Sequence, residues 1–172
     1  MLQLSGSLLN RQVLSLRSGG MVATTQSAII NPNNLKIEGF YCDDAFDRKK
    51  TSVLLYQDIR DTIAQGFVVN DQDALVDPGD LVRLKDILAV HFELLGKRVM
   101  TVSKQKVGKI SDFATEMETM YIQKLYVSQG GFKSLTGGSL SIDRTQIVDV
   151  TEHAIIINDL EDHLRARASL PA

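Results

Sequence analysis

The sequence predicts an all-β protein built from two small antiparallel β-barrels in tandem, packed together, with a short linker helix and a C-terminal helix. Three observations predict this fold class: four sequence blocks recur in the same order, short β-branched runs lie between turn residues, and helical patterns occur mainly between and after the repeats. The expected divisions are a first barrel at 1–76, a linker helix at 77–91, a second barrel at 92–160 and a C-terminal helix and tail at 161–172.

The internal repeat consists of four pairs of similar segments. Residues 8–16 (LLNRQVLSL) align with residues 94–102 (LLGKRVMTV). The later pairs are 37–41 with 122–126, 59–61 with 147–149, and 67–71 with 155–159. Their spacing drifts by only a few residues, as loop insertions would cause, so we interpret the two halves as homologous repeats.

Each repeat is expected to contain several short strands joined by tight turns. In the second repeat the polar stretch 103–106 separates Val99 from Val107, which predicts a β-hairpin. The equivalent stretch 17–20 contains two glycines, which adopt positive φ without steric cost, and residues 31–34 mark a second turn. Short strands must close or stack to hide their edges, so each repeat is expected to be a small barrel.

Two helices are predicted outside the barrels. The first begins at Asp77, an N-cap residue followed by proline, and leucines spaced at helical intervals give it one apolar face through His91. The second begins near Asn158, where Glu161 completes a capping box. The apolar face of the linker helix indicates that it packs on one or both barrels.

Five motifs of the second repeat carry a family resemblance: LLGKRV at 94–99, KVGKI at 106–110, IQKLY at 122–126, QIVDV at 146–150 and AIII at 154–157. They resemble the PRC-barrel family, the small β-barrel of the photosynthetic reaction-centre H subunit and of ribosome maturation factors. The first repeat shares the resemblance through its match to the second, although Asn10 stands where the second repeat has Gly96. The resemblance implies tandem PRC-barrel domains that bind partners rather than catalyse a reaction.

Composition excludes several classes of protein. Lys and Arg number 19 against 21 Asp and Glu, and the formal net charge of −2 argues against a protein that coats nucleic acid. The single Cys42 excludes a disulfide framework and fits a reducing compartment. No apolar run is long enough for a membrane span, and the first residues do not resemble a signal peptide, so a cytoplasmic protein is expected.

The sequence offers no recognisable catalytic, metal or cofactor constellation. The glycines at 137–138 lack phosphate-loop spacing, and Cys42 precedes two aspartates that disfavour a thiolate. The carboxylates of that loop are interpreted as solvated. The histidines do not have metal-ligand spacing; they are His91, His153 and His163. We therefore expect no enzymatic activity, no cofactor, no metal and no small-molecule ligand.

The candidate interaction surface is a basic stretch around the predicted hairpin of the second repeat. No acidic residue occurs from 96 to 110, and the stretch holds five cations: Lys97, Arg98, Lys104, Lys106 and Lys109. The alternative interpretation is an ordinary solvated edge, since lysines on edge strands block unwanted pairing. The groove between the barrels and the linker helix are the other candidate surfaces.

The sequence thus predicts a non-enzymatic binding or assembly module that mediates protein–protein interaction. The alternative is an RNA-linked factor in ribosome maturation or RNA metabolism, by analogy with the maturation-factor barrel. The expected partner is another protein, and RNA or the ribosome is the alternative partner. Contact with RNA would be weak and sensitive to salt.

Overall fold

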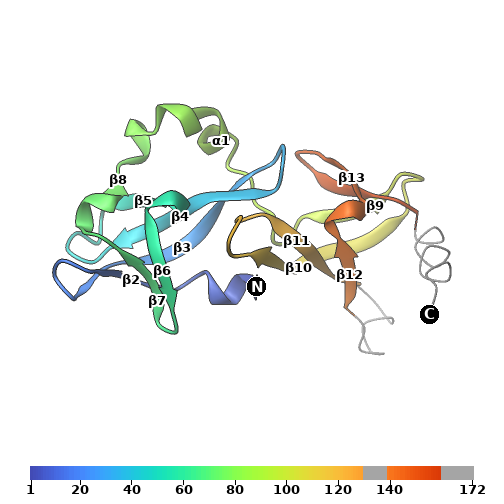
Figure 1. Cartoon of the computed structure of the whole chain (residues 1–172). Helices are drawn as coiled ribbons and strands as arrows, with labels where there is room; N and C mark the ends of the chain where they lie inside the picture. Colours follow the sequence, from blue (N-terminus) through green and yellow to red (C-terminus); the bar gives the residue numbers. More distant parts are fainter. Residues whose placement is uncertain (130–138, 160–172) are drawn as a thin grey trace. The chain divides into compact units, whose positions relative to one another are not determined.

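The computed structural model describes residues 1–129 and 139–159 (Figure 1). The chain divides into two compact units. The first unit comprises Met1–Phe92 and Thr115–Tyr121, and the second comprises Glu93–Ala114 and Ile122–Ala172. The first unit is organised around a seven-stranded β-sheet and the second around six strands of another sheet, and the described residues form one short α-helix.

The sheet of the first unit has the strand order β6-β7-β2-β3-β4-β5-β8. The strands are β2 (Gln12–Ser15), β3 (Met21–Asn31), β4 (Lys36–Asp44), β5 (Thr51–Leu55), β6 (Ile59–Ile63), β7 (Gly66–Val69) and β8 (Leu75–Val76). Phe40 on β4 and Phe67 on β7 are fully buried, and their rings stack with centroids 5.1 Å apart. This aromatic pair brings together β4 and β7, which are not neighbours in the sheet, in one apolar core.

The sheet of the second unit has the order β12-β11-β10-β9-β14-β13. The strands are β9 (Arg98–Thr101), β10 (Lys106–Glu116), β11 (Ile122–Ser128), β12 (Leu140–Asp143), β13 (Ile147–Val150) and β14 (Ala154–Ile157). The short β1 (Leu2–Leu4) also pairs with β10, whose last two residues belong to the first unit. Val99, Leu125 and Ile155 are among the fully buried side chains of the second core.

The prediction of closed antiparallel barrels is wrong in two respects. Each sheet is an open path of strands rather than a closed ring, and each is mixed, because β2 pairs with β7 and β9 with β14 in parallel. In the first unit, the 3-10 turn at Tyr56–Asp58 carries the chain from β5 into β6 without reversing its direction within the sheet. The hairpin that follows therefore returns β7 parallel to β2.

The predicted linker helix at 77–91 is mostly not α-helical. The segment forms 3-10 turns at Pro78–Asp80 and Val82–Leu84, and only α1 (Lys85–Val90) is an α-helix. Asp77 caps the segment as predicted, since its Oδ1 accepts a hydrogen bond from the Gly79 N–H at 2.8 Å. The helix does not continue because Gly79 weakens its first turn and Leu81 leaves the helical region. The predicted C-terminal helix at 161–172 lies outside the described residues.

The two sheets share strand order, register and turn conformation. The parallel ladder pairs Val13 with Phe67 in the first unit and Val99 with Ile155 in the second, which are the pairs that the sequence repeat aligns. Residues with positive φ also recur 85 or 86 positions apart: Asn10 and Gly96, Gly19 and Lys104, and Leu35 and Met120. Equivalent positions in the two units can therefore be compared one by one.

The segment Thr115–Tyr121 comprises the last two residues of β10 and the connection to β11, and it belongs to the first unit. The Ile37 N–H donates to the Met120 carbonyl at 2.8 Å, and the Met117 N–H donates to the Met1 carbonyl at 3.3 Å. The Lys36 ammonium lies 5.7 Å from the centre of the Tyr121 ring and bonds the Tyr56 hydroxyl at 2.9 Å. These bonds complete the first unit with residues from the middle of the second repeat.

Candidate cationic site of the second unit

The predicted hairpin of the second repeat is formed by β9 and β10. Its turn is closed by Thr101, whose carbonyl accepts from the Lys104 N–H at 2.9 Å and whose hydroxyl accepts from the Gln105 N–H at 3.1 Å. Lys104 adopts a left-handed conformation with φ of 66°. The pairing continues past the strand ends, since the Ile110 N–H donates to the Lys97 carbonyl at 2.9 Å. The basic stretch of the sequence is therefore a single rigid hairpin.

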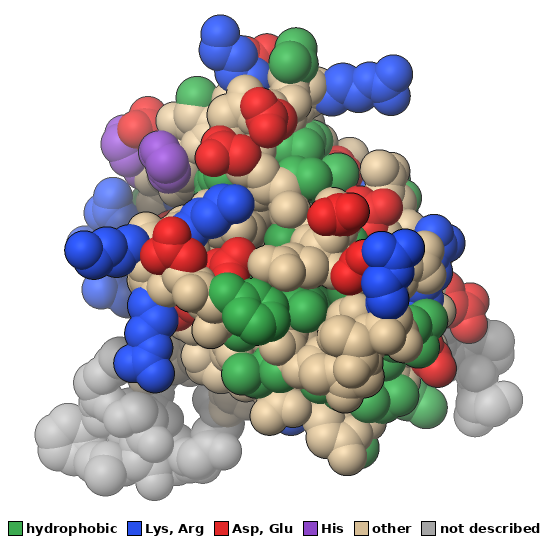
Figure 2. Space-filling view, turned by 90° about the vertical axis from the view of Figure 1, so that its left-hand side faces the viewer, with side chains coloured by type: hydrophobic (Ala, Val, Ile, Leu, Met, Phe, Trp, Pro, Cys, Tyr) green, Lys and Arg blue, Asp and Glu red, His purple; other side chains and the backbone are tan. Residues whose placement is uncertain are grey.

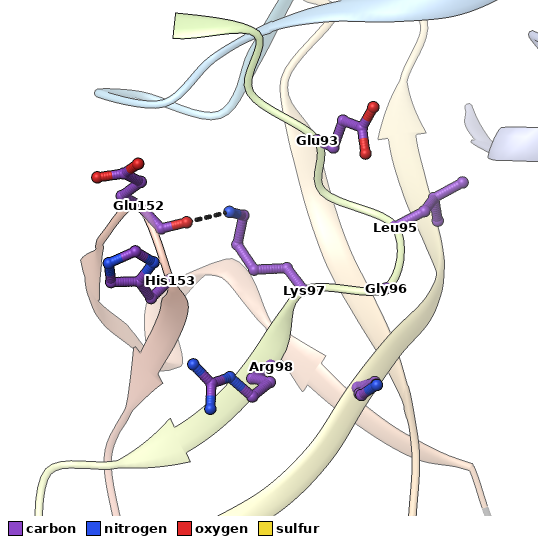
Figure 3. A pocket seen from close by; sticks show the side chains of 8 residues that line it. Glu93, Leu95, Gly96, Lys97, Arg98, Glu152 and His153 are labelled. Atoms are coloured by element: carbon purple, nitrogen blue, oxygen red, sulfur yellow. Dashed lines mark hydrogen bonds between the residues drawn. The ribbon is translucent and has the colours of Figure 1, made fainter.

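The structure divides the five predicted cations into two groups. Lys104 and Lys106 are exposed near the turn, whereas Lys97, Arg98 and Lys109 line one hollow of about 420 Å³ at the other end of the hairpin (Figure 3). The residues that line the hollow are Glu93, Leu95, Gly96, Lys97, Arg98, Lys109, Glu152 and His153. We call this feature the cationic hollow, and all of its residues belong to the second unit.

Lys97 crosses the hollow and is held at its far side. Its ammonium donates a hydrogen bond of 2.7 Å to the Glu152 carbonyl, drawn in Figure 3. Partial burial lowers the pKa of Lys97, and the nearby charges of Glu152 and Glu93 oppose that shift. Lys97 therefore ties the start of β9 to the turn before β14.

Arg98 and Lys109 form a pair of like charges. They are Cα partners in the ladder of β9 and β10, and both side chains are exposed. Within residues 1–129 and 139–159, no ion pair or side-chain hydrogen bond involves either group. Like charges at directly opposed ladder positions destabilise a sheet, so this pair would gain from a bound anion.

Sequence reasoning missed the acidic and histidine residues of the hollow. Glu152 and His153 are far from Arg98 in the sequence, and the parallel pairing of Ala154 with Arg98 brings them beside it. No local pattern indicates this pairing. Glu93 lies just before the basic stretch, and its position beside that stretch was the only signal available in the sequence.

The other residues singled out in the sequence have structural roles. Burial raises the pKa of the Cys42 thiol to about 12. The Asp44 carboxylate accepts hydrogen bonds from the backbone N–H groups of Phe46 and Asp47 and so caps its own loop. His91 ends α1 in a left-handed conformation. No three histidine, cysteine or acidic residues of the described part could hold a metal ion together. His163 and the glycines at 137–138 lie outside the described residues.

The family comparison decides the identity of this part of the chain. Residues 91–164 match the family model of the PRC-barrel domain. This part of the chain is a PRC-barrel domain. The match confirms the family resemblance drawn from the motifs at 94–157, and it contains every residue of the cationic hollow. The chain matched none of the curated proteins with which it was compared.

The helices of the described residues are too short for a membrane span. The one α-helix, α1, has six residues, and no helix in that part of the chain is both long and apolar enough to cross a bilayer.

Proposed function

We propose that the chain is a non-enzymatic binding or assembly module that acts through protein–protein interaction. The observation that carries this proposal is the PRC-barrel domain whose β9–β10 hairpin presents four exposed cations, with Lys97 held beside them. A surface that is rigid and concentrated in charge loses little entropy when it docks, which suits a binding module. The hairpin is the proposed partner surface.

The non-enzymatic part of the proposal rests on the environment of the reactive side chain that the sequence offers. Cys42 is fully buried, and its pKa of about 12 leaves almost no thiolate at neutral pH. Its thiol donates to the Phe40 carbonyl at 3.6 Å, a contact within its own strand. A buried and unpaired cysteine also fits a reducing compartment, which supports the proposal of a cytoplasmic module.

The first unit is proposed to be a second PRC-barrel-like domain. Its sheet has the strand order of the second unit, and the two parallel ladders have equivalent registers. This arrangement supports a tandem origin for the chain. The proposal predicts that the first unit supplies framework for the module and that the second supplies the charged surface.

A protein partner suits the charge distribution better than RNA. Figure 2 shows Lys and Arg side chains interspersed with Asp and Glu on the face in view, and the formal net charge is −2. Tyr121, a candidate for stacking on a base, already contacts the Lys36 ammonium. RNA in ribosome maturation or RNA metabolism is the second candidate, because five cations on one hairpin could also meet phosphates.

The test is capture of partners from native lysate with the full chain and two charge-reversal variants. The first variant is K104E/K106E/K109E on the hairpin, and the matched control is R48E/K49E/K50E on an exposed loop of the first unit. We expect a protein partner that survives nuclease treatment, is lost with the first variant and is kept with the control. Loss on nuclease treatment would favour RNA, and retention by the hairpin variant would remove this surface.

A further inference from the structure

Comparison with the first unit separates two roles among the cations of the hollow. In the first unit the Arg11 guanidinium donates to the Ala64 carbonyl, at the positions equivalent to Lys97 and Glu152. Both sheets therefore have a cation that closes onto the turn before the strand of the parallel ladder, β7 in the first unit and β14 in the second. Lys97 belongs to this shared framework and is already occupied.

Arg98 and Lys109 have no charged counterparts in the first unit. The equivalent ladder pair is Gln12 with Thr24, two neutral residues. Both sheets form with the same strand order, so the fold does not require the two cations. Their repulsion across the ladder is a feature that the second unit adds.

The surroundings of this pair define what can bind there. Glu93 and Glu152 line the same hollow, so a continuous run of phosphates would meet two carboxylates. The described residues that line the hollow include no Phe, Tyr or Trp, and His153 supplies the one ring on which a base could stack. Leu95, which is 41% exposed, adds an apolar contact at the same place.

We propose that the cationic hollow binds a carboxylate side chain of an acidic protein segment that also presents an apolar side chain. The Arg98 guanidinium and the Lys109 ammonium would both donate to the carboxylate, and Leu95 would contact the apolar neighbour. A guanidinium offers two parallel N–H donors that match the two carboxylate oxygens. This inference rests on the proposed function and names the ligand chemistry of its surface.

The test is a nuclear magnetic resonance titration of the full ¹⁵N-labelled chain with the peptide acetyl-Gly-Leu-Glu-Glu-Gly-amide. We expect shifts at the amides of residues 96–98, 109 and 152–153. The variant R98Q/K109T carries the residues of the first unit and should weaken peptide binding by about tenfold or more. The control K104Q/K106T removes the same amount of charge outside the hollow and should change the affinity for the peptide by less than about twofold. The spectra also report whether both variants fold.

Three outcomes would overturn the proposal. Equal losses of peptide affinity in R98Q/K109T and K104Q/K106T would show that the whole hairpin attracts the peptide without a specific site. Equal shifts with a peptide in which Gln-Gln replaces Glu-Glu would show that the carboxylates do not contribute to binding. Stronger shifts with a uridine 12-mer would assign the hollow to RNA. If the hollow ignores the acidic peptide while K104E/K106E/K109E still loses a captured protein, the proposed function stands and only this ligand chemistry fails.

Discussion

The first and second units adopt the same backbone conformation at equivalent turns but have different residues there. Asn10 and Gly96 occupy equivalent left-handed positions, and so do Gly19 and Lys104. Glycine and asparagine adopt this conformation readily, whereas lysine at such a turn is uncommon. The comparison teaches that the topology requires the sign of φ at these turns more strictly than it requires a particular residue. The bond that closes the turn is common to both units, since the Ser15 carbonyl accepts from the Gly19 N–H as the Thr101 carbonyl accepts from the Lys104 N–H.

The surfaces of the two units differ where their backbones agree. The pair of Gln12 and Thr24 is neutral, while the equivalent pair of Arg98 and Lys109 carries two positive charges. Because the neutral pair is compatible with the fold, the fold does not require the charged pair, and this difference is the basis of the binding role proposed for it. Four predictions test this comparison, from the largest expected effect to the smallest.

Cys42 is the chain's single cysteine and gives the first unit a probe that the second lacks. Its pKa of about 12, raised by burial from 9.0, predicts that its thiolate population is reduced by roughly a thousandfold relative to a free thiol near pH 8. Labelling with a chromogenic disulfide should therefore be slow in buffer and fast in urea. Comparison with the loss of circular dichroism shows whether the first unit opens with the second. Labelling at the rate of free cysteine in buffer would contradict the buried position.

Gly66 and Ala154 occupy equivalent positions in the two parallel ladders, but only the backbone at position 154 has room for a side chain. A Cβ on Gly66 would lie 2.0 Å from the Gln12 carbonyl oxygen, and its φ is +156°. Gly66→Ala should lower the free energy of unfolding by about 3 kcal/mol or more, whereas Ala154→Gly should lower it by only about 0.5–1 kcal/mol. Urea denaturation measures both. Gly6→Ala is the control, because nothing lies within 4 Å of its Cβ. Equal losses of stability in Gly66→Ala and Ala154→Gly would contradict the prediction that the backbone excludes a side chain at position 66.

Exchange of the charged pair Arg98 and Lys109 with the neutral pair Gln12 and Thr24 tests whether charge repulsion destabilises the second sheet. R98Q/K109T should raise the free energy of unfolding by about 0.2–1 kcal/mol, and Q12R/T24K should lower it by a similar amount. Both changes should shrink in 1 M salt, which screens exposed charges. Urea denaturation at low and high salt measures them. A loss of stability in R98Q/K109T would show that the cations stabilise the free protein.

Asp71 follows β7 and Asp159 follows β14, and these equivalent residues use different partners. Asp71 pairs with Arg17 at 2.7 Å, whereas Asp159 accepts from the Ser103 hydroxyl at 2.6 Å. The hydrogen bonds from Ser103 lower the pKa of Asp159. Its contribution to stability is therefore present above the ordinary carboxyl pKa and is lost as the pH falls through the lowered value. Asp159→Asn should be slightly less stable at pH 7 and should match the wild type at strongly acid pH. A difference in stability between Asp159→Asn and the wild type that persists in acid would show that the ionised carboxylate is not its cause.

Local patterns predicted the hairpins and turns well. The polar stretch after Val99 forms the predicted turn, and the residues at 31–34 join β3 to β4. The repeat alignment also placed Phe67 and Ile155 at equivalent positions, and the structure confirms that equivalence. These features depend on residues that are neighbours in the sequence or on the repeat itself.

Long-range pairing could not be derived from the same patterns. The parallel return of β7 beside β2 depends on the direction of the chain after Tyr56–Asp58, and all four residues of β7 are buried, so no alternation marks an inner face. The hollow was missed for the same reason, because Glu152 reaches Lys97 only through β14. The linker was predicted as a helix from its leucine spacing, but none of the residues of α1 is fully buried.

Because Thr115–Tyr121 belongs to the first unit, that unit can form all of its hydrogen bonds only after part of the second repeat has been synthesised. The ribosome synthesises this segment after Phe92, so the first unit lacks its partners for Ile37 and Met1 while the next 29 residues are added. At roughly 5–20 residues per second, that delay is about 1.5–6 s. During this interval the Ile37 N–H and the Met1 carbonyl lack their final partners. The first unit, although it is translated first, is completed by the connection between β10 and β11 in the second repeat.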